Sequence, residues 1–351
     1  MKYKLEDLCS YAKGKIEVEA LTDKNYISTE NMLPNKGGIT TATSLPSTAQ
    51  TQRYQKFDIL VSNIRPYFKK IWFAEFDGGC SNDVLVFRAK DGVSKRFLYY
   101  VLANDTFFDY SMATSKGTKM PRGDKAAIMK YDVPDFTYEE QEKIAGILDA
   151  LDRKIQLNSE INKNLEQQAQ AYFDELFVVN ADPNWPECTL SDIGSVVAGG
   201  TPSKSKPEYY ADQGIAWITP KDLSIDKSKF ISHGENDISE LGFSKSSATK
   251  MPAGTILFSS RAPIGYIAIA QNEVTTNQGF KSVIPNENIG TAYVYFLLKN
   301  LLPTIEGMAS GSTFKEISGA AMKSVPGSMS RLWTQKVELF SPYLIARRDV
   351  F

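Results

Sequence analysis

The sequence contains few residues of the kinds that build metal centres, disulfide frameworks or imidazole-based active sites. Its 351 residues include only three cysteines and one histidine. Cys9, Cys80 and Cys188 lie far apart and lack the spacing of metal ligands, so we expect reduced thiols, no metal site and a cytoplasmic protein. His233 stands among polar residues, which favours a position in a loop over a role as a catalytic base.

Long apolar runs are also missing from the sequence. No stretch of 18 apolar residues occurs, so the sequence predicts no membrane-spanning helix and no membrane partner. The first residues, which include Lys2, Lys4, Glu6 and Asp7, are too polar for a secretion signal.

Sequence signatures of enzymes are equally scarce. We find no glycine-rich dinucleotide loop, no phosphate loop ending in Gly-Lys-Ser/Thr and no Asn-Pro-Pro-aromatic tetrapeptide of methyltransferases. A nuclease-like pattern can be assembled from Pro134-Asp135 and Asp152-Arg153-Lys154. Its second half falls in a predicted helix, where solvated charge explains it better, so we expect no catalytic residue in this chain.

The net charge of −1 is unevenly distributed along the chain. Residues 36–130 hold 15 Lys/Arg and 8 Asp/Glu, a surplus of +7, whereas residues 138–177 hold 4 Lys/Arg and 9 Asp/Glu, a balance of −5. One interpretation is a basic domain that meets phosphates beside an acidic segment that faces protein. Scattered solvated charge is the other, and these counts do not decide between them.

The stretch from Tyr138 to Phe177 is the most regular part of the sequence, with no proline and one glycine. Its apolar residues recur at alternating steps of four and three, a heptad pattern that predicts one long helix paired lengthwise with another. At about 1.5 Å per residue this helix would measure roughly 60 Å and act as a spacer. An ordinary amphipathic helix within one compact domain is the alternative. The predicted seam comprises Ile144, Leu148, Leu151, Ile155, Leu165, Ala169, Tyr172 and Leu176, with Asn158 and Asn162 in the intervening turns, where asparagine fixes register.

The residues before and after this stretch repeat one pattern. Asp58–Pro66 is echoed by Thr255–Pro263, and Phe97–Leu102 by Tyr293–Leu298. The offset between matched motifs drifts only from 197 (Asp58 to Thr255) to 192 (Val133 to Val325). We therefore predict an α+β protein with two similar mixed domains of short strands, joined by the long helix. The predicted domains are residues 1–137 and 186–326, the helix is residues 138–178, and residues 327–351 begin a second such helix.

Local patterns indicate some elements of the first domain. Strands are predicted at residues 57–62, 71–76 and 84–87, and a helix at residues 97–103. Val133-Pro134 should end the domain, because proline cannot continue a helix.

The second copy carries a series of motifs in a fixed order. It opens with Leu190–Gly194 and Gly199–Ser203, and continues with Ile215–Leu223, Ser259–Gly265 and Thr276–Lys281. Together with the internal repeat and the heptad helix, these motifs closely resemble the specificity subunit of Type I restriction–modification systems. The resemblance covers about residues 1–335.

This resemblance implies that each copy is a target-recognition domain that reads one half of a bipartite site in double-stranded DNA. The helices after the two domains would form an antiparallel pair that sets the spacing and docks two methyltransferase (modification) subunits. In that family the specificity subunit is not catalytic. Modification and restriction/translocase subunits supply methylation and cleavage, so S-adenosylmethionine, ATP and Mg²⁺ are expected on those subunits and no cofactor on this chain.

The resemblance also points to loops rich in hydroxyl groups, amides and cations. Such groups contact phosphates, Arg and Lys can donate to guanine edges, and Asn and Gln can pair with adenine. A surface or capping role is the alternative for each, and Trp72, Trp217 and Phe280 are interpreted as core residues rather than stacking surfaces. The candidate DNA-binding residues are Ser62, Asn63, Arg65, Lys69, Lys116, Thr118, Lys119, Arg122, Thr201, Ser203, Lys204, Lys206, Lys221, Ser259, Ser260, Arg261, Asn277, Gln278, Lys281, Ser312, Thr313 and Lys315.

Two other functions stay open at this point, a self-contained nuclease or methyltransferase and a coiled-coil adaptor that binds no nucleic acid. The predicted seam also needs a cover. Only about 20 residues follow Arg331, and Pro342 interrupts them, so the second helix looks largely missing. We expect methyltransferase helices or a second copy of the chain, paired antiparallel as a self-dimer, to cover the seam.

Overall fold

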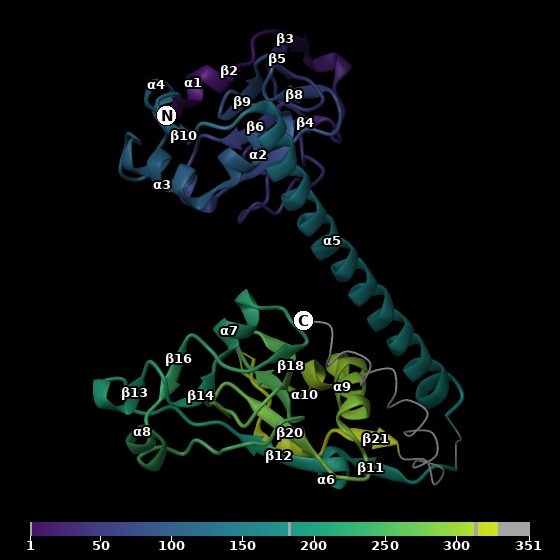
Figure 1. Cartoon of the computed structure of the whole chain (residues 1–351). Coiled ribbons are helices and arrows are strands. Elements are labelled where there is room, and N and C mark those ends of the chain that lie inside the picture. Colours follow the sequence, from purple (N-terminus) through teal and green to yellow (C-terminus); the bar gives the residue numbers. More distant parts are fainter. Residues whose placement is uncertain (1, 182–183, 312–314, 329–351) are drawn as a thin grey trace. The chain divides into compact units, whose positions relative to one another are not determined.

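The long helix α5 (Tyr138–Asp174) is the longest element of the computed structural model, which describes residues 2–181, 184–311 and 315–328. The chain forms two compact units, Met1–Ser159 and Glu160–Phe351 (Figure 1). The boundary between them falls inside α5, so each unit consists of one domain and one part of that helix.

The first domain is built on a four-stranded sheet in the order β2-β9-β6-β7, with every neighbouring pair antiparallel. A second four-stranded sheet has the order β3-β5-β8-β4, and β1 pairs with β10. The strands are β1 (Lys2–Lys4), β2 (Cys9–Tyr11), β3 (Lys15–Glu17), β4 (Tyr26–Ile27), β5 (Gln50–Tyr54), β6 (Ile59–Ser62), β7 (Ile71–Phe73), β8 (Gly78–Cys80), β9 (Val84–Ala89) and β10 (Asp132–Pro134). The helices are α1 (Leu5–Leu8), α2 (Lys95–Ala103), α3 (Asp105–Ala113) and α4 (Lys125–Ile128), with 3-10 turns η1 (Val18–Ala20) and η2 (Pro66–Phe68).

The second domain is built on a five-stranded sheet in the order β12-β20-β17-β18-β15. A four-stranded sheet has the order β13-β16-β14-β19, and β11 pairs with β21. The strands are β11 (Glu187–Thr189), β12 (Gly194–Ala198), β13 (Tyr210–Ala211), β14 (Ile215–Ile218), β15 (Phe230–Ile231), β16 (Asn236–Ile238), β17 (Ile256–Ser260), β18 (Ile264–Ala270), β19 (Thr275–Thr276), β20 (Lys281–Pro285) and β21 (Pro326–Ser328). The helices are α6 (Leu190–Ile193), α7 (Pro220–Ile225), α8 (Glu240–Ser244), α9 (Thr291–Asn300), α10 (Leu302–Met308) and α11 (Gly319–Lys323), with a 3-10 turn η4 (Pro207–Tyr209).

The two domains share one plan. The order β2-β9-β6-β7 matches β12-β20-β17-β18, and in each domain a short strand near the start pairs with the strand that ends the domain. The smaller sheets differ in strand order. The predicted architecture, two similar α+β domains joined by a long helix, is confirmed.

The predicted strands and helix of the first domain correspond to β6, β7, β9 and α2. Successive side chains of a strand point to opposite faces of the sheet, so Ile59, Val61, Leu85 and Phe87 lie together in one core cluster, which α2 covers. Trp72 and Trp217 are 8% and 6% exposed and Phe280 is fully buried, so the interpretation of these three as core residues is confirmed. The sequence did not reveal that β1 closes the domain by pairing with β10.

The start of α5 is fixed by a capping box. The Thr137 backbone N–H donates to Glu140 Oε2 (2.8 Å), and the Glu140 N–H donates to Thr137 Oγ1 (3.3 Å). These reciprocal bonds satisfy donors that a helix start leaves without partners. The Thr137 N–H and the Thr137 hydroxyl both donate to the Glu140 carboxylate, and these two bonds hold the pKa of Glu140 below its usual range.

In the first unit, α5 is attached to α2. Gln141 accepts from the Ser94 N–H (3.0 Å), and Ala145 is buried in the core of the domain. One turn further, Asp149 pairs with Arg96, and the Tyr100 hydroxyl donates to Asp152 (2.8 Å). Asp152, part of the nuclease-like pattern, is thus an exposed helix charge bonded to tyrosine.

In the second unit, the end of α5 and the π-helical turn η3 (Glu175–Val179) enter the core of the domain. Ala169, Phe173 and Phe177 belong to the same buried cluster as Tyr293 and Phe296 of α9. The Phe173 ring lies 5.4 Å from Tyr293 and 6.2 Å from Phe296, between ring centroids. Burial of these aromatic rings fixes the helix end to the domain.

A polar cluster beside these rings holds Glu166. It accepts hydrogen bonds from Lys299 Nζ (2.7 Å) and the Tyr295 hydroxyl (3.1 Å) and pairs with Lys229 Nζ (3.2 Å). Burial opposes the ionisation of Glu166, but the bonds and charges of the two lysines outweigh it and lower its pKa.

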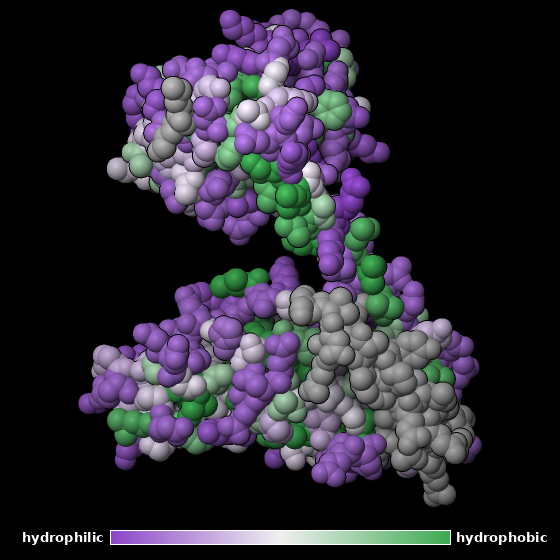
Figure 2. Space-filling model, in the orientation of Figure 1, coloured by the Kyte–Doolittle hydropathy of each residue, from purple (hydrophilic) through white to green (hydrophobic). Residues whose placement is uncertain are grey.

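The residues of the predicted seam differ in burial: those near the two ends of α5 pack against the domains, and several of those between are exposed. Ile144 packs against the core of the first domain, and Leu176 and Ala169 pack against the second. Ala169 is therefore covered by its own domain, whereas Ile144 and Leu176 are only partly buried, and their assignment to a helix-pairing seam stays a prediction. The exposed seam residues are Leu151 (53%), Ile155 (68%), Leu165 (40%) and Tyr172 (45%), joined by Ile147 (65%), while Leu148, Asn158 and Asn162 are half-buried. Figure 2 shows hydrophobic surface along this helix.

The residues predicted to begin a second long helix start with β21, which covers Pro326–Ser328. Residues 329–351, which include the rest of that prediction, lie outside the described residues.

The three cysteines carry free thiols and are buried. Burial raises the pKa of Cys9 and Cys80 to about 12 and that of Cys188 to about 11, so they stay protonated at neutral pH. Among the described residues, no helix is both long enough and apolar enough to cross a bilayer.

The Glu166 cluster predicts a specific dependence of stability on pH. A carboxylate whose pKa is lowered by folding stabilises the folded state above its unfolded pKa, about 4.3, and this contribution is lost as pH falls through the folded pKa. We expect Glu166→Gln to lower the unfolding free energy by about 1–3 kcal/mol at pH 7. The difference from wild type should shrink as the pH approaches 3.

Urea denaturation between pH 7 and pH 3 measures this difference. Glu287→Gln, which changes an exposed carboxylate in the same unit, should stay within about 0.5 kcal/mol of wild type throughout. A Glu166→Gln deficit that remains constant or grows at acid pH would contradict the assignment.

Candidate nucleic-acid interface

In the first domain, two loops pair at the end of β6. The backbone of Ile64 forms a bridge with Arg122, which also bridges to Lys116, and the Gly123 N–H donates to the Asn63 carbonyl (3.2 Å). The 116–123 loop is therefore held against the loop that follows β6, and both carry candidate residues.

The second domain repeats this arrangement at the end of β17. Arg261 forms a bridge with Glu316, Glu316 bridges to Ser310, and the Ile317 N–H donates to the Ser260 carbonyl (3.1 Å). The internal repeat thus extends to the loops, but the side chains differ. The equivalent positions in first and second domain are Asn63 and Ser260, Ile64 and Arg261, Lys116 and Ser310, and Arg122 and Glu316.

Both loops contain a strained residue directly before a proline. Arg65 precedes Pro66 with φ of 49°, and Ala262 precedes Pro263 with φ of 51°. Left-handed backbone is unfavourable for residues other than glycine, and such strain is found most often at functional sites. After Arg65 the chain exposes Tyr67 (47%).

Acidic partners hold most of the cations at these loops. In the first domain Arg122 pairs with Asp83 (3.2 Å) and Lys116 with Asp124 (2.6 Å). Lys69 shares Asp105 with Lys36, at 3.0 Å and 2.7 Å, and the hydrogen bonds of Lys36 and Lys69 lower the pKa of Asp105. Each of these cations therefore has a carboxylate partner that favours one direction of its side chain.

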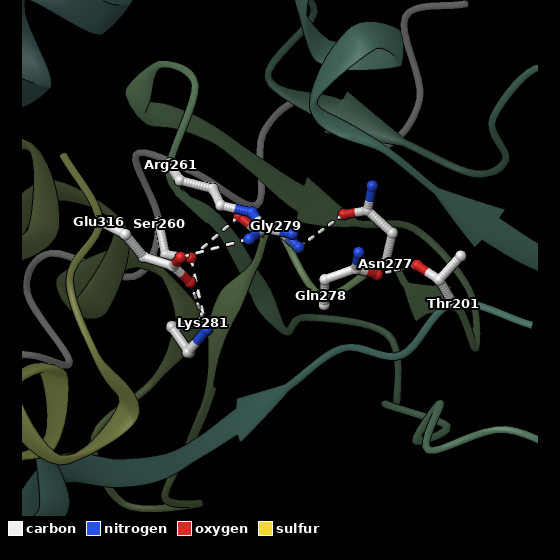
Figure 3. A network of polar contacts seen from close by, with 8 residues as sticks. All are labelled: Thr201, Ser260, Arg261, Asn277, Gln278, Gly279, Lys281 and Glu316. Atoms are coloured by element: carbon white, nitrogen blue, oxygen red, sulfur yellow. Dashed lines mark hydrogen bonds and ion pairs between the residues drawn. The ribbon is translucent and has the colours of Figure 1, made fainter. Parts of the chain in front are cut away.

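In the second domain Glu316 accepts from two cations (Figure 3). Arg261 Nη1 lies 3.3 Å from one carboxylate oxygen, and Lys281 Nζ lies 3.5 Å from the other. The Lys281 side chain is only 11% exposed and also approaches Ser260 Oγ (3.5 Å). Lys281 therefore does not fit the expectation of a direct base contact, since its ammonium is committed inside the domain.

The glycine pair of the 199–206 loop is tightly packed rather than open. A Cβ on Gly199 would lie 2.0 Å from the Asn277 carbonyl, and one on Gly200 would lie 2.3 Å from the Ala248 nitrogen. The Gly200 carbonyl accepts from Trp217 Nε1 (2.9 Å). The loop is therefore fixed on the domain, and only its continuation from Ser203 to Lys206 is exposed.

The side-chain amides among the candidates differ in whether they are exposed and free to contact a ligand. Asn277 Oδ1 accepts from the Gly279 N–H (2.8 Å), so its amide is folded back on its own loop. Gln278 is exposed and accepts from the Thr201 hydroxyl, as Figure 3 shows. Asn63 is only 9% exposed, and its Oδ1 has no hydrogen-bond partner among the described residues.

Three candidate serines do not fit the expectation of direct contact. Ser62 is 4% exposed, and Ser259 and Ser260 are fully buried. Their hydroxyls donate to the carbonyls of Ile64, Pro263 and Gly279, at 3.1, 2.8 and 3.1 Å. These serines hold the loops in shape.

Other candidates lie at the surface. Ser312 and Thr313 are outside the described residues. Asp83 and Glu316 were not among the candidates predicted from the sequence. The one sign of them there is a carboxylate within a loop of the internal repeat. The exposed candidates are Lys116, Thr118, Lys119, Arg122, Ser203, Lys204, Lys206, Lys221 and Lys315, of which Lys206 pairs with Glu208 and Lys221 with Glu235.

A family profile described as the Type I restriction modification DNA specificity domain matches residues 1–167 and 183–337. The chain is 41% identical to the Type I restriction enzyme MjaIX specificity subunit of Methanocaldococcus jannaschii over 155 residues, which are 44% of this chain. That match spans only 36% of the relative's length.

A second relative is matched over most of both chains. It is the Type I restriction enzyme HindI specificity subunit of Haemophilus influenzae, 25% identical, with 89% of this chain and 85% of the relative covered. The crystal structure of a Type I restriction–modification S subunit from M. genitalium has a similar fold, with a TM-score of 0.61 at 18% identity, covering 99% of this chain and 90% of that chain.

The packing of the 199–206 loop predicts that alanine at two different glycine positions changes the unfolding free energy in opposite directions. Gly200→Ala should lower the unfolding free energy by about 1–3 kcal/mol or more, because its Cβ would overlap backbone atoms. Gly307→Ala, at an exposed helix position of the same domain with open space, should raise it by about 0.5–1 kcal/mol. Urea denaturation measures both, and a neutral Gly200→Ala would show that the loop is loose.

Proposed function

The chain belongs to the Type I restriction modification DNA specificity family, and we propose that it selects the DNA sequence on which such a restriction–modification complex acts. Each domain reads one half of a bipartite site in duplex DNA. One observation carries this proposal: the two domains place equivalent loop pairs, at Ile64–Arg122 and Arg261–Glu316, at the end of equivalent strands. Two loops of the same construction with different side chains fit two half-sites of different sequence.

The tethered cations support a role in DNA binding. Arg122 is 55% exposed while paired with Asp83, and Arg261 is 37% exposed while paired with Glu316. Arginine held in one orientation suits bidentate contacts to guanine or phosphate. The acidic partners also reduce the local positive charge, so affinity for DNA outside the proper site should be low.

Catalysis is assigned to other subunits in this proposal. Methyltransferase (modification) subunits would bind S-adenosylmethionine, restriction/translocase subunits would use ATP and Mg²⁺, and the assembly would act in the cytoplasm. The sequence signatures of a self-contained nuclease or methyltransferase are missing, and the one nuclease-like pattern contains the helix charge Asp152.

Methylation mapping tests this function directly. The chain is co-produced with the modification subunits of its system, and modified bases are mapped across a genome. We expect one bipartite motif whose sequence follows the specificity chain supplied. Methylation that does not depend on this chain, or DNA modification by the chain alone with S-adenosylmethionine, would contradict the proposal.

The exposed apolar face of α5 is proposed to bind another helix. Ile147, Leu151 and Ile155 recur on one face of the helix within the first unit and are all more than half exposed. Apolar groups of this size in sequence along a helix mark an interface. The modification subunits would cover this face in the complex, and a second copy of the chain would cover it when the chain is purified alone.

Leu151→Asp tests this interface. A buried aspartate at the centre of an apolar face is strongly unfavourable, so we expect the variant to abolish concentration-dependent dimers of the isolated chain in sedimentation. Asn164→Asp adds the same charge about 140° away around the helix and should leave dimers intact. If wild type is monomeric at every concentration, a second copy is not the cover, and the variant is then tested for loss of binding to modification subunits.

A further inference from the structure

Each domain pairs one arginine of its loop bridge with a carboxylate, but the two arginines stand on opposite strands of the bridge, and only in the second domain is the carboxylate the bridge partner itself. In the first domain the arginine is Arg122, on the 116–123 loop, and its carboxylate is Asp83 at 3.2 Å. In the second the arginine is Arg261, at the end of β17, and its carboxylate is Glu316 at 3.3 Å. Glu316 occupies the position of Arg122, so the charge at that position is reversed.

A buried lysine supports the reversed pair in the second domain. Ile59 pairs with Phe87, and its equivalent Ile256 pairs with Val283, so Lys281 corresponds to the buried Leu85 of the first domain. A lysine in place of a core leucine is unfavourable unless its charge is compensated. Lys281 Nζ lies 3.5 Å from Glu316 Oε1, the carboxylate oxygen that does not contact Arg261, and this contact compensates the charge of the lysine.

The ion pair leaves Arg261 able to reach a ligand. The contact to Glu316 uses one terminal nitrogen, Nη1, and the side chain is 37% exposed. Arg261 directly precedes the strained Ala262 in the loop after β17, and its guanidinium contacts the Glu316 carboxylate, as Figure 3 shows. An orientation fixed before binding lowers the entropy lost when a planar, two-pronged contact forms.

We propose that Arg261 and Arg122 are the specificity-determining residues that each read a guanine in one half-site, and that Glu316, supported by Lys281, and Asp83 are their positioning residues. The proposal rests on the function proposed above. Arginine is the side chain whose donors match the O6 and N7 acceptors of guanine. Because the two arginines belong to opposite strands of the bridge, the guanine should stand at different places in the two half-sites.

The test maps methylation motifs of reconstituted complexes that contain wild-type chain, Arg261→Lys or Glu316→Gln. The motif of the wild-type complex should contain a G·C pair in the half-site of the second domain. Both variants should lower discrimination at that pair by about 10-fold or more and leave the other half-site unchanged. Arg122→Lys and Asp83→Asn should do the same at one pair of the first half-site.

Salt dependence separates a positioning role from a phosphate contact. Glu316→Gln removes no cation, so the slope of log affinity against log salt should match wild type while base preference relaxes. Glu273→Gln, which breaks the Lys250–Glu273 surface pair (3.1 Å) in the same domain, should change neither quantity. If Glu316→Gln fails to fold, Arg261→Lys alone tests the proposal, because this variant keeps the charge on a partly exposed side chain.

The possible failures are distinguishable. A wild-type complex without a bipartite motif would refute the function and the inference with it. A bipartite motif whose second half-site lacks a G·C pair, or is unchanged by Arg261→Lys, would overturn the inference and leave the function standing.

Discussion

The structure depends on the attachment of α5 to a domain at each of its ends. In the first unit Gln141 and Asp149 bind α2, and in the second Phe173 is buried among aromatic rings while Glu166 is held by two lysines. Each attachment combines a buried contact with a charged hydrogen bond, and both fix the direction in which the helix leaves its domain. A domain that moved freely on the helix could not hold its loops at a defined place on a partner.

The loops show how one domain plan can serve two specificities. Equivalent strands, a bridge between two loops and a strained residue before proline recur in both copies. The side chains on this frame have changed, from Ile64 and Arg122 to Arg261 and Glu316. Backbone hydrogen bonds hold the frame, so its surface residues can vary without loss of the fold.

Sequence periodicity predicted what depends on local spacing: the length of α5, the strands of the large sheet and the internal repeat. It could not show which neighbour covers an apolar residue, so Ala169 was placed in a seam although its own domain buries it. Nor could it show cross-strand neighbours, which is why Ser260 and Lys281 were taken for surface contacts. Close backbone packing leaves no mark in composition, so the sequence did not show that Gly200 and its loop are fixed on the domain.

The most direct test of this account is the spacing of the recognised site. Inserting four helix-forming residues after Asn158 adds about one turn and roughly 6 Å, close to two base pairs of duplex, while keeping the helix faces nearly in phase. Methylation mapping should then show both half-sites unchanged and a spacer longer by one or two base pairs. The same insertion after Asp91, in an exposed turn of the first domain, should leave the spacer as in wild type. An unchanged spacer after the α5 insertion would contradict the claim that this helix fixes the distance between two readers.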